Sequence, residues 1–282
     1  MRCAWQAFLN LVPVWMREVV DKQGRDSLLE LRLRLNSPPM LITNNNKIWL
    51  NRLTSQEDIQ FCINVGSKYS PWSATTIANG YITASGGHRI GVCGEVITDG
   101  KQIKGIRTAT SLCLRVARDF PGIAREVNQY NGSILIIGAP GCGKTTLLRD
   151  VVRQRSNSNY GVVGVVDERE EIFPRNNGLM CFPIGKNTDV LAGCGKAQGI
   201  EMLLRNVTPS TIAVDEITAK EDCEAMLHAC WCGVKLVATA HAGSRNDLFS
   251  RPIYRPLIDN GIFDTVLILN EDKSWRTERM KS

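Results

Sequence analysis

The sequence predicts an α/β protein in which a mostly parallel sheet is covered by helices and is preceded by a small α+β domain. The first observation is a series of short apolar runs in the second half of the chain, at residues 133–137, 162–166, 211–214 and 236–239. Segments of helical character, at 145–155, 199–205 and 221–232, separate these runs. The second observation is that the runs are continuously apolar, which is typical of strands buried on both faces of a parallel sheet.

The first 130 residues show a different pattern, and we expect them to form the small domain and a linker. A chain of 282 residues is long enough for two domains. An apolar stripe with helical spacing runs from Trp5 to Trp15, and because Pro13 interrupts it we expect one short amphipathic helix. Residues 29–35 alternate Leu and Arg, the pattern of a half-exposed strand that carries Arg32 and Arg34 outward.

Turn and cap signals complete this part of the chain. Thr54 and Glu57 have the spacing of a capping box, which predicts a helix over 54–65. From residue 80 to 116, short β-prone runs alternate with glycine-rich turns, and 118–130 reads as a linker that breaks at Pro121 and Gly122. We therefore expect domains at 1–130 and 131–282.

The net charge of +6 is unevenly distributed. Residues 1–130 contain 16 Lys and Arg against 10 Asp and Glu, whereas residues 131–282 contain 18 of each kind. A basic first domain is compatible with an anionic membrane face, nucleic acid, an acidic partner, or a solvated surface without a ligand. The chain lacks the basic block with interleaved aromatic residues that would favour nucleic acid.

Ten cysteines and the absence of long apolar runs bear on the compartment. The first 16 residues lack the features of a secretory signal, so we expect reduced cysteines and a cytoplasmic protein. Cys223, His228, Cys230 and Cys232 fall in one predicted helix without paired CxxC spacing, which favours buried thiols over zinc ligands. No run approaches the roughly 20 apolar residues of a membrane span.

The strongest functional signal is a glycine-rich segment between the first apolar run of the second domain and a helix. Its residues fit the pattern G-x-x-x-x-G-K-[ST] followed by a second threonine: Gly138, Ala139, Pro140, Gly141, Cys142, Gly143, Lys144, Thr145 and Thr146. A strand before it and a helix after it are the context of a phosphate-binding loop, or P-loop. Backbone N–H groups and the helix N-terminus would bind the phosphates of ATP. We expect Lys144 to reach the β- and γ-phosphates and the Thr145 hydroxyl to bind Mg²⁺.

A pair of carboxylates ends the apolar run 211–214. Asp215 follows Lys144 by 71 residues, a normal spacing for a Walker B strand beside the P-loop strand. We expect Asp215 to hold Mg²⁺ through water and Glu216 to polarise the attacking water.

Two further strand ends carry polar residues. The run 162–166 ends in Asp167 and Glu168, with Glu171 close behind, so a second acidic strand end is present. The run 236–239 leads through Thr239 to His241. Because parallel strands present their carboxyl ends to the ligand crevice, we expect Thr239 and His241 to sense the γ-phosphate, although an isolated histidine is as often a surface residue.

The order of these motifs resembles that of the secretion and pilus-motor ATPases within the RecA-like P-loop class. Over nearly its whole length the chain is also similar to the stage III sporulation protein AA family of endospore-forming bacteria. The stretches that carry this resemblance are LRLRL (31–35), GGHRIG (86–91), LRVARD (114–119), GCGKTTLLR (141–149), VVDER (165–169), GIEMLLR (199–205) and ATAH (238–241).

The resemblance implies a role for individual residues. The matching positions are Gly143, Lys144 and Thr145 for phosphate and Mg²⁺, Asp167, Glu168 and Glu171 for an acidic box with a general base, Asp215 and Glu216 for Walker B, and His241 for a histidine box. Arg89 and Arg115 match arginines of the N-terminal domain that can approach the nucleotide in the motor ATPases. Which of Glu168, Glu171 and Glu216 is the base stays open, with Glu216 first because it directly follows the Walker B aspartate.

Three functions remain open from the sequence. The favoured one is an ATPase that hydrolyses ATP with Mg²⁺ to drive or gate a membrane-embedded channel or secretion complex during endospore formation, in the mother-cell cytoplasm. An arginine from the small domain or from a neighbouring subunit would complete its site, so we expect a ring, namely a hexamer. The alternatives are a nucleotide-gated scaffold with little turnover and an ATPase acting on nucleic acid. The two acidic strand ends favour hydrolysis.

Overall fold

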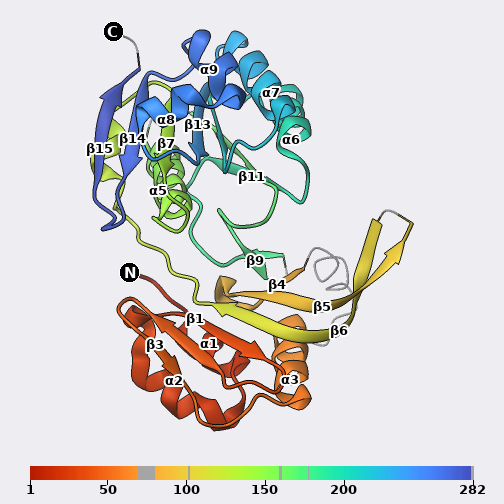
Figure 1. The fold of residues 1–282 in the computed structure, drawn as a ribbon. Helices are drawn as coiled ribbons and strands as arrows, with labels where there is room; N and C mark the ends of the chain where they lie inside the picture. Colours follow the sequence, from red (N-terminus) through yellow and green to blue (C-terminus); the bar gives the residue numbers. More distant parts are fainter. Residues whose placement is uncertain (69–79, 101, 159–160, 177, 281–282) are drawn as a thin grey trace. The chain divides into compact units, whose positions relative to one another are not determined.

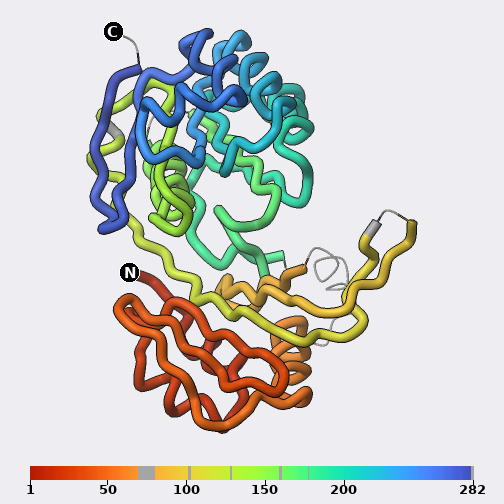
Figure 2. Tube along the Cα trace, viewed as in Figure 1, coloured from red at the N-terminus to blue at the C-terminus, as the bar shows by residue number. Residues whose placement is uncertain are grey.

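The computed structural model describes residues 1–282 except 69–79, 101, 159–160, 177 and 281–282, and the chain divides into two compact units (Figures 1 and 2). The N-terminal unit comprises Met1–Asp119 together with Pro174–Cys181. The second unit comprises Phe120–Phe173 and Phe182–Ser282. The segment 120–130, which the sequence analysis assigns to a linker, therefore packs as part of the second unit.

The N-terminal unit is built on a six-stranded antiparallel sheet with the order β3-β2-β1-β6-β5-β4. Its elements are α1 (Trp5–Leu11), α2 (Val14–Ser27), β1 (Leu28–Arg34), β2 (Met40–Thr43), β3 (Lys47–Trp49), α3 (Gln56–Ser67), β4 (Tyr81–Thr83), the 3₁₀ helix η2 (Ser85–Gly87), β5 (Arg89–Asp99) and β6 (Gln102–Arg115). Alternation decides which face is buried. Leu31 of β1 pairs with Leu114 of β6. Both are fully buried, in one apolar core with side chains of α1, α2 and α3. Arg34 is exposed on the other face, as the Leu–Arg alternation predicts.

One local prediction for this unit is incomplete and another is wrong. The short helix expected before Pro13 is α1, which ends at Leu11, but Pro13 is also the N-cap of a second helix, α2, where its missing N–H is not needed. The capping box of α3 is formed one residue later than predicted, with Asp58 N donating to Ser55 Oγ at 3.3 Å and Ser55 N donating to Asp58 Oδ2 at 3.0 Å. Thr54 is instead held in extended pairing, because its amide donates to the carbonyl of Ser37 at 2.9 Å.

A short hairpin joins the N-terminal unit from a distant part of the sequence. It consists of β9 (Arg175–Asn176) and β10 (Leu179–Met180). Lys68 Nζ donates to Asn176 Oδ1 at 2.7 Å, and Asn176 Nδ2 donates to the carbonyl of Thr83 at 3.5 Å. The chain thus leaves the second unit after Phe173 and returns to it at Phe182.

The second unit contains a seven-stranded sheet with the order β11-β8-β12-β13-β7-β14-β15, in which every pairing except β14 with β15 is parallel. Its elements are η3 (Arg125–Gln129), β7 (Ile134–Gly138), α5 (Lys144–Asn157), β8 (Val163–Asp167), β11 (Thr188–Ala192), α6 (Lys196–Asn206), β12 (Thr211–Val214), α7 (Lys220–Trp231), β13 (Lys235–Ala240), α8 (Arg245–Ser250), η4 (Pro252–Tyr254), α9 (Arg255–Asp259), β14 (Thr265–Leu269) and β15 (Trp275–Arg279).

The strands of this sheet are buried on both faces, as their continuous apolar runs predict. Leu135 and Ile137 of β7 belong to the core that α6, α7 and α9 complete. Ile134 and Ile136 alternate with them on the opposite face, which α5 covers, and are equally buried. One expectation fails: the strand before Asp215, β12, does not lie beside the P-loop strand β7, because β13 pairs with both and separates them.

All ten cysteines are free thiols. Cys223 is buried and Cys230 is half-buried, but Cys232 is exposed because it caps the end of α7, so the expectation of buried thiols is wrong for that residue. Within the part of the chain that the structure describes, no three His, Cys, Asp or Glu side chains are grouped to hold a metal ion. The same residues include no helix long and apolar enough to cross a membrane.

The fully buried His88 makes the stability of the N-terminal unit depend on pH. The amide of Ala117 donates to His88 Nδ1 at 3.0 Å, so the ring hydrogen is on Nε2, which donates to the carbonyl of Ala4 at 2.9 Å. Burial lowers the pKa of His88 below its usual 6.5. The folded state therefore binds this proton less tightly than the unfolded state. Its contribution to stability is complete above pH 6.5 and is lost as the pH falls from there through the folded-state pKa.

We therefore expect the unfolding free energy of the protein to fall below about pH 6.5 with a slope of up to ~1.4 kcal/mol per pH unit. His88→Gln, which cannot take up the proton, should flatten this dependence between about pH 7 and pH 5. The measurement is chemical unfolding at a series of pH values. His228→Gln is the matched control, because it replaces an exposed histidine on α7 instead of a buried one. An equally steep loss in His88→Gln would contradict the assignment.

Candidate nucleotide-binding site

The loop between β7 and α5 has the backbone geometry of a P-loop and needs its glycines. Gly143 is the N-cap of α5 with φ of 108°, and Gly141 has φ of 77°, both in the region that strains other residues. A Cβ atom on Gly138 would lie 2.6 Å from Cys142 Sγ and 2.9 Å from the carbonyl oxygen of Leu269. The loop therefore packs too closely for a larger residue at the end of β7.

Lys144, the first residue of α5, is buried and fully engaged. Its Nζ donates to the carbonyls of Gly138 and Ala139, each at 3.0 Å, and lies 3.1 Å from His241 Nδ1. An ammonium group only donates, so His241 Nδ1 accepts and the ring hydrogen is on Nε2. That atom lies 3.0 Å from Glu216 Oε1 and donates to it. A chain of hydrogen bonds thus connects the P-loop lysine through His241 to Glu216.

The carboxyl end of β12 is tied to both α5 and β13. Thr145 Oγ1 donates to Asp215 Oδ2 at 2.6 Å, and Thr239 Oγ1 donates to Asp215 Oδ1 at 2.5 Å. The Thr239 hydroxyl in turn accepts from the amide of Glu216 at 2.8 Å. Glu216 has φ of 49°, an uncommon value for a residue with a side chain. The fully buried Thr239 hydroxyl therefore fixes both residues of the acidic pair.

Asp167, at the end of β8, holds its own loop. Its Oδ1 accepts from the amides of Glu171 at 2.8 Å and Ile172 at 3.1 Å, and its Oδ2 accepts from the amide of Phe173 at 2.7 Å. Burial raises the pKa of Asp167, and so does the charge of Asp215, while the amides act in the opposite direction. The oxygens of Asp167 are therefore committed to the acidic-box loop, which we define as residues 167–173.

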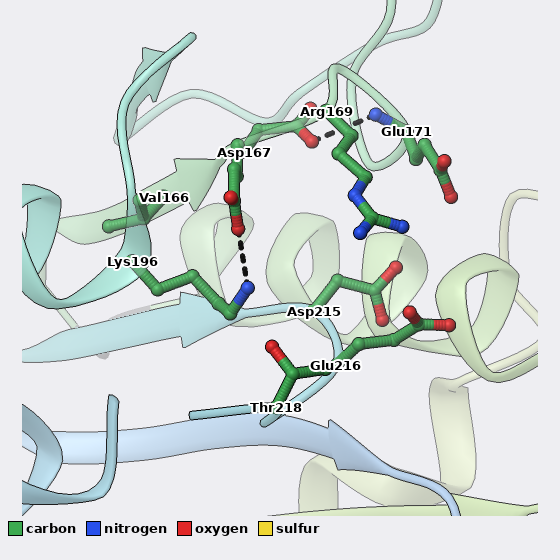
Figure 3. Close-up of a pocket in the computed structure, with 9 residues that line it drawn as sticks. Val166, Asp167, Arg169, Glu171, Lys196, Asp215, Glu216 and Thr218 are labelled. Carbon is green, nitrogen blue, oxygen red and sulfur yellow. Dashed lines mark hydrogen bonds and ion pairs between the residues drawn. The ribbon is translucent and has the colours of Figure 1, made fainter. Parts of the chain in front are cut away.

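Beside this loop lies a pocket in which acidic residues meet two cations (Figure 3). Its lining consists of Val166, Asp167, Glu168, Arg169, Glu171, Lys196, Asp215, Glu216 and Thr218. Lys196 is buried at the start of α6, with its Nζ 2.5 Å from Glu168 Oε2 and 3.8 Å from Asp222 Oδ2. Figure 3 shows the Arg169 side chain lying between Glu171 and Asp215. Neither cation was predicted as a site residue: Arg169 stands inside the VVDER stretch (165–169), but Lys196 follows Glu168 by 28 residues with no motif to mark it.

The structure brings most of the predicted site residues to one edge of the parallel sheet. Lys144, Thr145, Asp215, Glu216 and His241 are joined by the hydrogen bonds described above. In the rest of the loop, Ala139, Pro140 and Gly141 are exposed, Cys142 is buried and Thr146 is half-buried.

Arg89 and Arg115 lie in the N-terminal unit, where they are partners in the register of β5 and β6. Arg115 Nε is 3.4 Å from Glu30 Oε2, and the Arg89 guanidinium lies 4.1 Å from the centre of the Tyr81 ring. Their approach to a nucleotide stays a prediction.

The residues at the strand ends fit Mg²⁺ bound together with a nucleotide. Thr145 Oγ1 and Asp215 Oδ2 are hard oxygen donors 2.6 Å apart, next to the P-loop. Mg²⁺ prefers oxygen ligands and usually takes one or two from the protein, with the others from phosphate and water. A small donor set beside a phosphate-binding loop is therefore what such an ion requires.

Comparison with known proteins assigns the chain to a family. The profile of the family described as sporulation stage III, protein AA matches residues 5–279. The chain belongs to this family. Stage III sporulation protein AA of Bacillus subtilis (strain 168) is 37% identical over 268 residues, which cover 92% of this chain and 87% of the relative. Protein SEEDLING PLASTID DEVELOPMENT 1 of Arabidopsis thaliana is 26% identical over 96% of this chain, which spans 38% of that longer protein.

Solved structures show that this member of the stage III sporulation protein AA family has the fold of the ATPase DotB and of the pilus retraction motor PilT. The ATPase DotB of Legionella pneumophila superposes with a TM-score of 0.58 at 18% identity, over 95% of this chain and 80% of DotB. The pilus retraction motor PilT, solved with ADP, gives 0.58 at 16% identity, over 89% of this chain and 76% of PilT. The predicted RecA-like P-loop core behind a small α+β domain is therefore confirmed.

The Thr239 hydroxyl gives a testable measure of how this edge of the sheet is stabilised. Thr239→Val keeps the shape but leaves one oxygen of the half-buried Asp215 carboxylate and the Glu216 amide without this partner, so we expect a loss of roughly 1–3 kcal/mol in unfolding free energy. Thr239→Ser keeps the hydroxyl and should lose about 1 kcal/mol at most, for the methyl group. Urea unfolding of both variants measures the difference. Equal stability of the two would show that the hydroxyl bonds contribute nothing.

Proposed function

We propose that this protein is a Mg²⁺-dependent ATPase that drives or gates a membrane-associated secretion or channel complex. The observation that carries the proposal is a set of side chains at the carboxyl ends of the parallel strands. There Lys144 Nζ lies 3.1 Å from His241 Nδ1, and His241 Nε2 lies 3.0 Å from Glu216 Oε1. A nucleotide-binding site needs only the lysine and the Thr145–Asp215 pair. The additional carboxylate, oriented by a histidine that also touches the lysine, favours hydrolysis over binding alone.

Lys144 would exchange partners when ATP binds. Its three hydrogen bonds now go to two loop carbonyls and His241, and phosphate oxygens would replace some of them as stronger, charged acceptors. Thr145 and Asp215 would hold Mg²⁺, which when bound neutralises charge on the phosphate oxygens. The P-loop amides and the N-terminus of α5 would hold the phosphates in place.

Glu216 is the carboxylate best placed to orient the attacking water. Asp167 is occupied by three backbone amides, and Glu168 is paired with Lys196 at 2.5 Å. The Glu216 side chain is one-third exposed, so water can reach it, and His241 fixes its direction. Glu171 is the alternative, because it lines the same pocket.

Family membership supports a role in sporulation, because the Bacillus subtilis relative is named for stage III of that process. The proposal places this role in the mother-cell cytoplasm during endospore formation. Action on a membrane complex would go through a membrane-embedded partner. The proposal includes assembly of several copies into a hexamer, in which Arg115 or Arg89 of a neighbouring copy would complete the nucleotide site.

Hydrolysis and assembly are tested together by measuring Mg²⁺-dependent ATP turnover across a protein concentration series. We expect specific activity to rise with concentration. Lys144→Ala should lose nucleotide affinity, whereas Glu216→Gln should bind ATP but turn it over about 10²–10⁴-fold more slowly. Glu224→Gln, on the exposed surface of α7, is the matched control and should behave like the wild type.

The same experiment distinguishes the alternatives. Specific activity that is constant with concentration would contradict a site completed by a second copy. Clear ATP binding without turnover, at every concentration and with membrane-partner domains added, would replace the motor by a nucleotide-gated scaffold.

A further inference from the structure

Both the amides and the carbonyls of the acidic-box loop are hydrogen-bonded to side chains. Asp167 accepts hydrogen bonds from the amides of Glu171 and Ile172, as described above, and Arg149 donates to the carbonyls of the same two residues. Arg149 Nη2 donates to the carbonyl of Glu171 at 2.9 Å, and its Nε donates to that of Ile172. The side chain is 5% exposed, so this charge lies inside the second unit.

Arg149 belongs to α5, the helix that follows the P-loop. Arg149 lies five residues after Lys144 on α5, a rise of about 7.5 Å along the axis. Its guanidinium is stacked 4.6 Å from the centre of the buried Phe182 ring, where the chain re-enters the unit. Arg153, one turn further along α5, donates to the carbonyl of Pro183 at 3.0 Å and to Asp150 Oδ1 at 2.7 Å. The same helix face therefore fixes the chain before and after the 174–181 hairpin.

We infer that Arg149 is a positioning residue for ATP hydrolysis, which holds the acidic-box loop against the P-loop helix so that the carboxylates of Glu168 and Glu171 keep their place in the pocket with Asp215 and Glu216. The inference rests on the function proposed above. It makes α5 the common support of two parts of the site: its first turn faces the phosphates, and its second turn carries the loop with the acidic side chains.

The chemistry of the contact requires arginine. Two N–H groups in one rigid plane reach two successive carbonyls, and the flat face stacks on an aromatic ring. A lysine at this position would keep the charge but could not span both carbonyls in a fixed geometry or stack in the same way. The charge of Arg149 also favours the ionised form of Asp167, the residue that binds the amides of the loop.

Arg155 provides a matched control on the same helix. It is 2% exposed, and its Nη2 also donates to two backbone carbonyls, those of Tyr130 at 3.1 Å and Gly132 at 2.6 Å. These carbonyls lie before β7 and outside the acidic-box loop. Arg155→Lys therefore reproduces the loss of a buried arginine without touching the loop.

The test compares Arg149→Lys with Arg155→Lys in the full chain. For Arg149→Lys we expect kcat to fall about 10–100-fold, with KM for ATP and affinity for Mg²⁺·ADP changed by less than about threefold. Amide hydrogen exchange in the peptide that covers 167–173 should become faster in Arg149→Lys. In Arg155→Lys both kcat and this exchange should stay at the wild-type level, even if thermal stability falls equally in the two variants.

Each outcome has a separate meaning. Wild-type kcat and unchanged exchange in Arg149→Lys would overturn the inference, and so would equal losses of kcat in both variants, because the effect would then be a general loss of stability. If the wild type itself has no turnover, the proposed function fails while hydrogen exchange still decides the positioning role: unchanged exchange in Arg149→Lys overturns it, and faster exchange confined to 167–173 supports it.

Discussion

The rest of the site depends on the hydrogen bonds made by the buried ammonium group of Lys144. A charge removed from water needs a full set of partners, and this one has three acceptors for its three hydrogens: two P-loop carbonyls and His241. Two of these hydrogen bonds connect the lysine to the backbone of its own loop. In the proposed function, phosphate oxygens would replace some of these acceptors, and His241 would connect that exchange to Glu216 at the end of β12.

The carboxylates of the pocket would repel one another if they were left alone, and four of them have different compensating partners. Backbone amides hold Asp167, the Lys196 ammonium holds Glu168, two threonine hydroxyls hold Asp215, and an imidazole holds Glu216. These partners differ in charge. A group of acidic residues that looks uniform in sequence is therefore divided into members that support the backbone and members that can take part in chemistry.

Local patterns predicted the parts of the fold that depend on local physics. The apolar runs of β7, β8, β12 and β13, and the glycine-rich turn before α5, require nothing beyond their own residues, and the fold class is confirmed. Pairing decided the rest. Other features join segments that only the folded chain brings together. Examples are the place of β13 between β7 and β12, the contact of Lys196 with Glu168, and the hydrogen bond from Arg149 to the carbonyl of Ile172. The N-cap of α3 is Ser55, one residue after the predicted Thr54, because the Thr54 amide is hydrogen-bonded to the carbonyl of Ser37.

The 174–181 hairpin has a consequence for how the two units can be inherited and recombined. The chain passes between the units three times, after Asp119, after Phe173 and after Cys181. A fragment that starts at residue 120 would carry the hairpin without the sheet it packs on, and Asn176 would lose Lys68 and Thr83. Neither unit is one continuous stretch of sequence, so a single crossover between two relatives could not exchange a whole unit. Any chimera within the family has to move the hairpin together with the N-terminal unit, so the evolutionary module here is a set of contacts rather than a stretch of sequence.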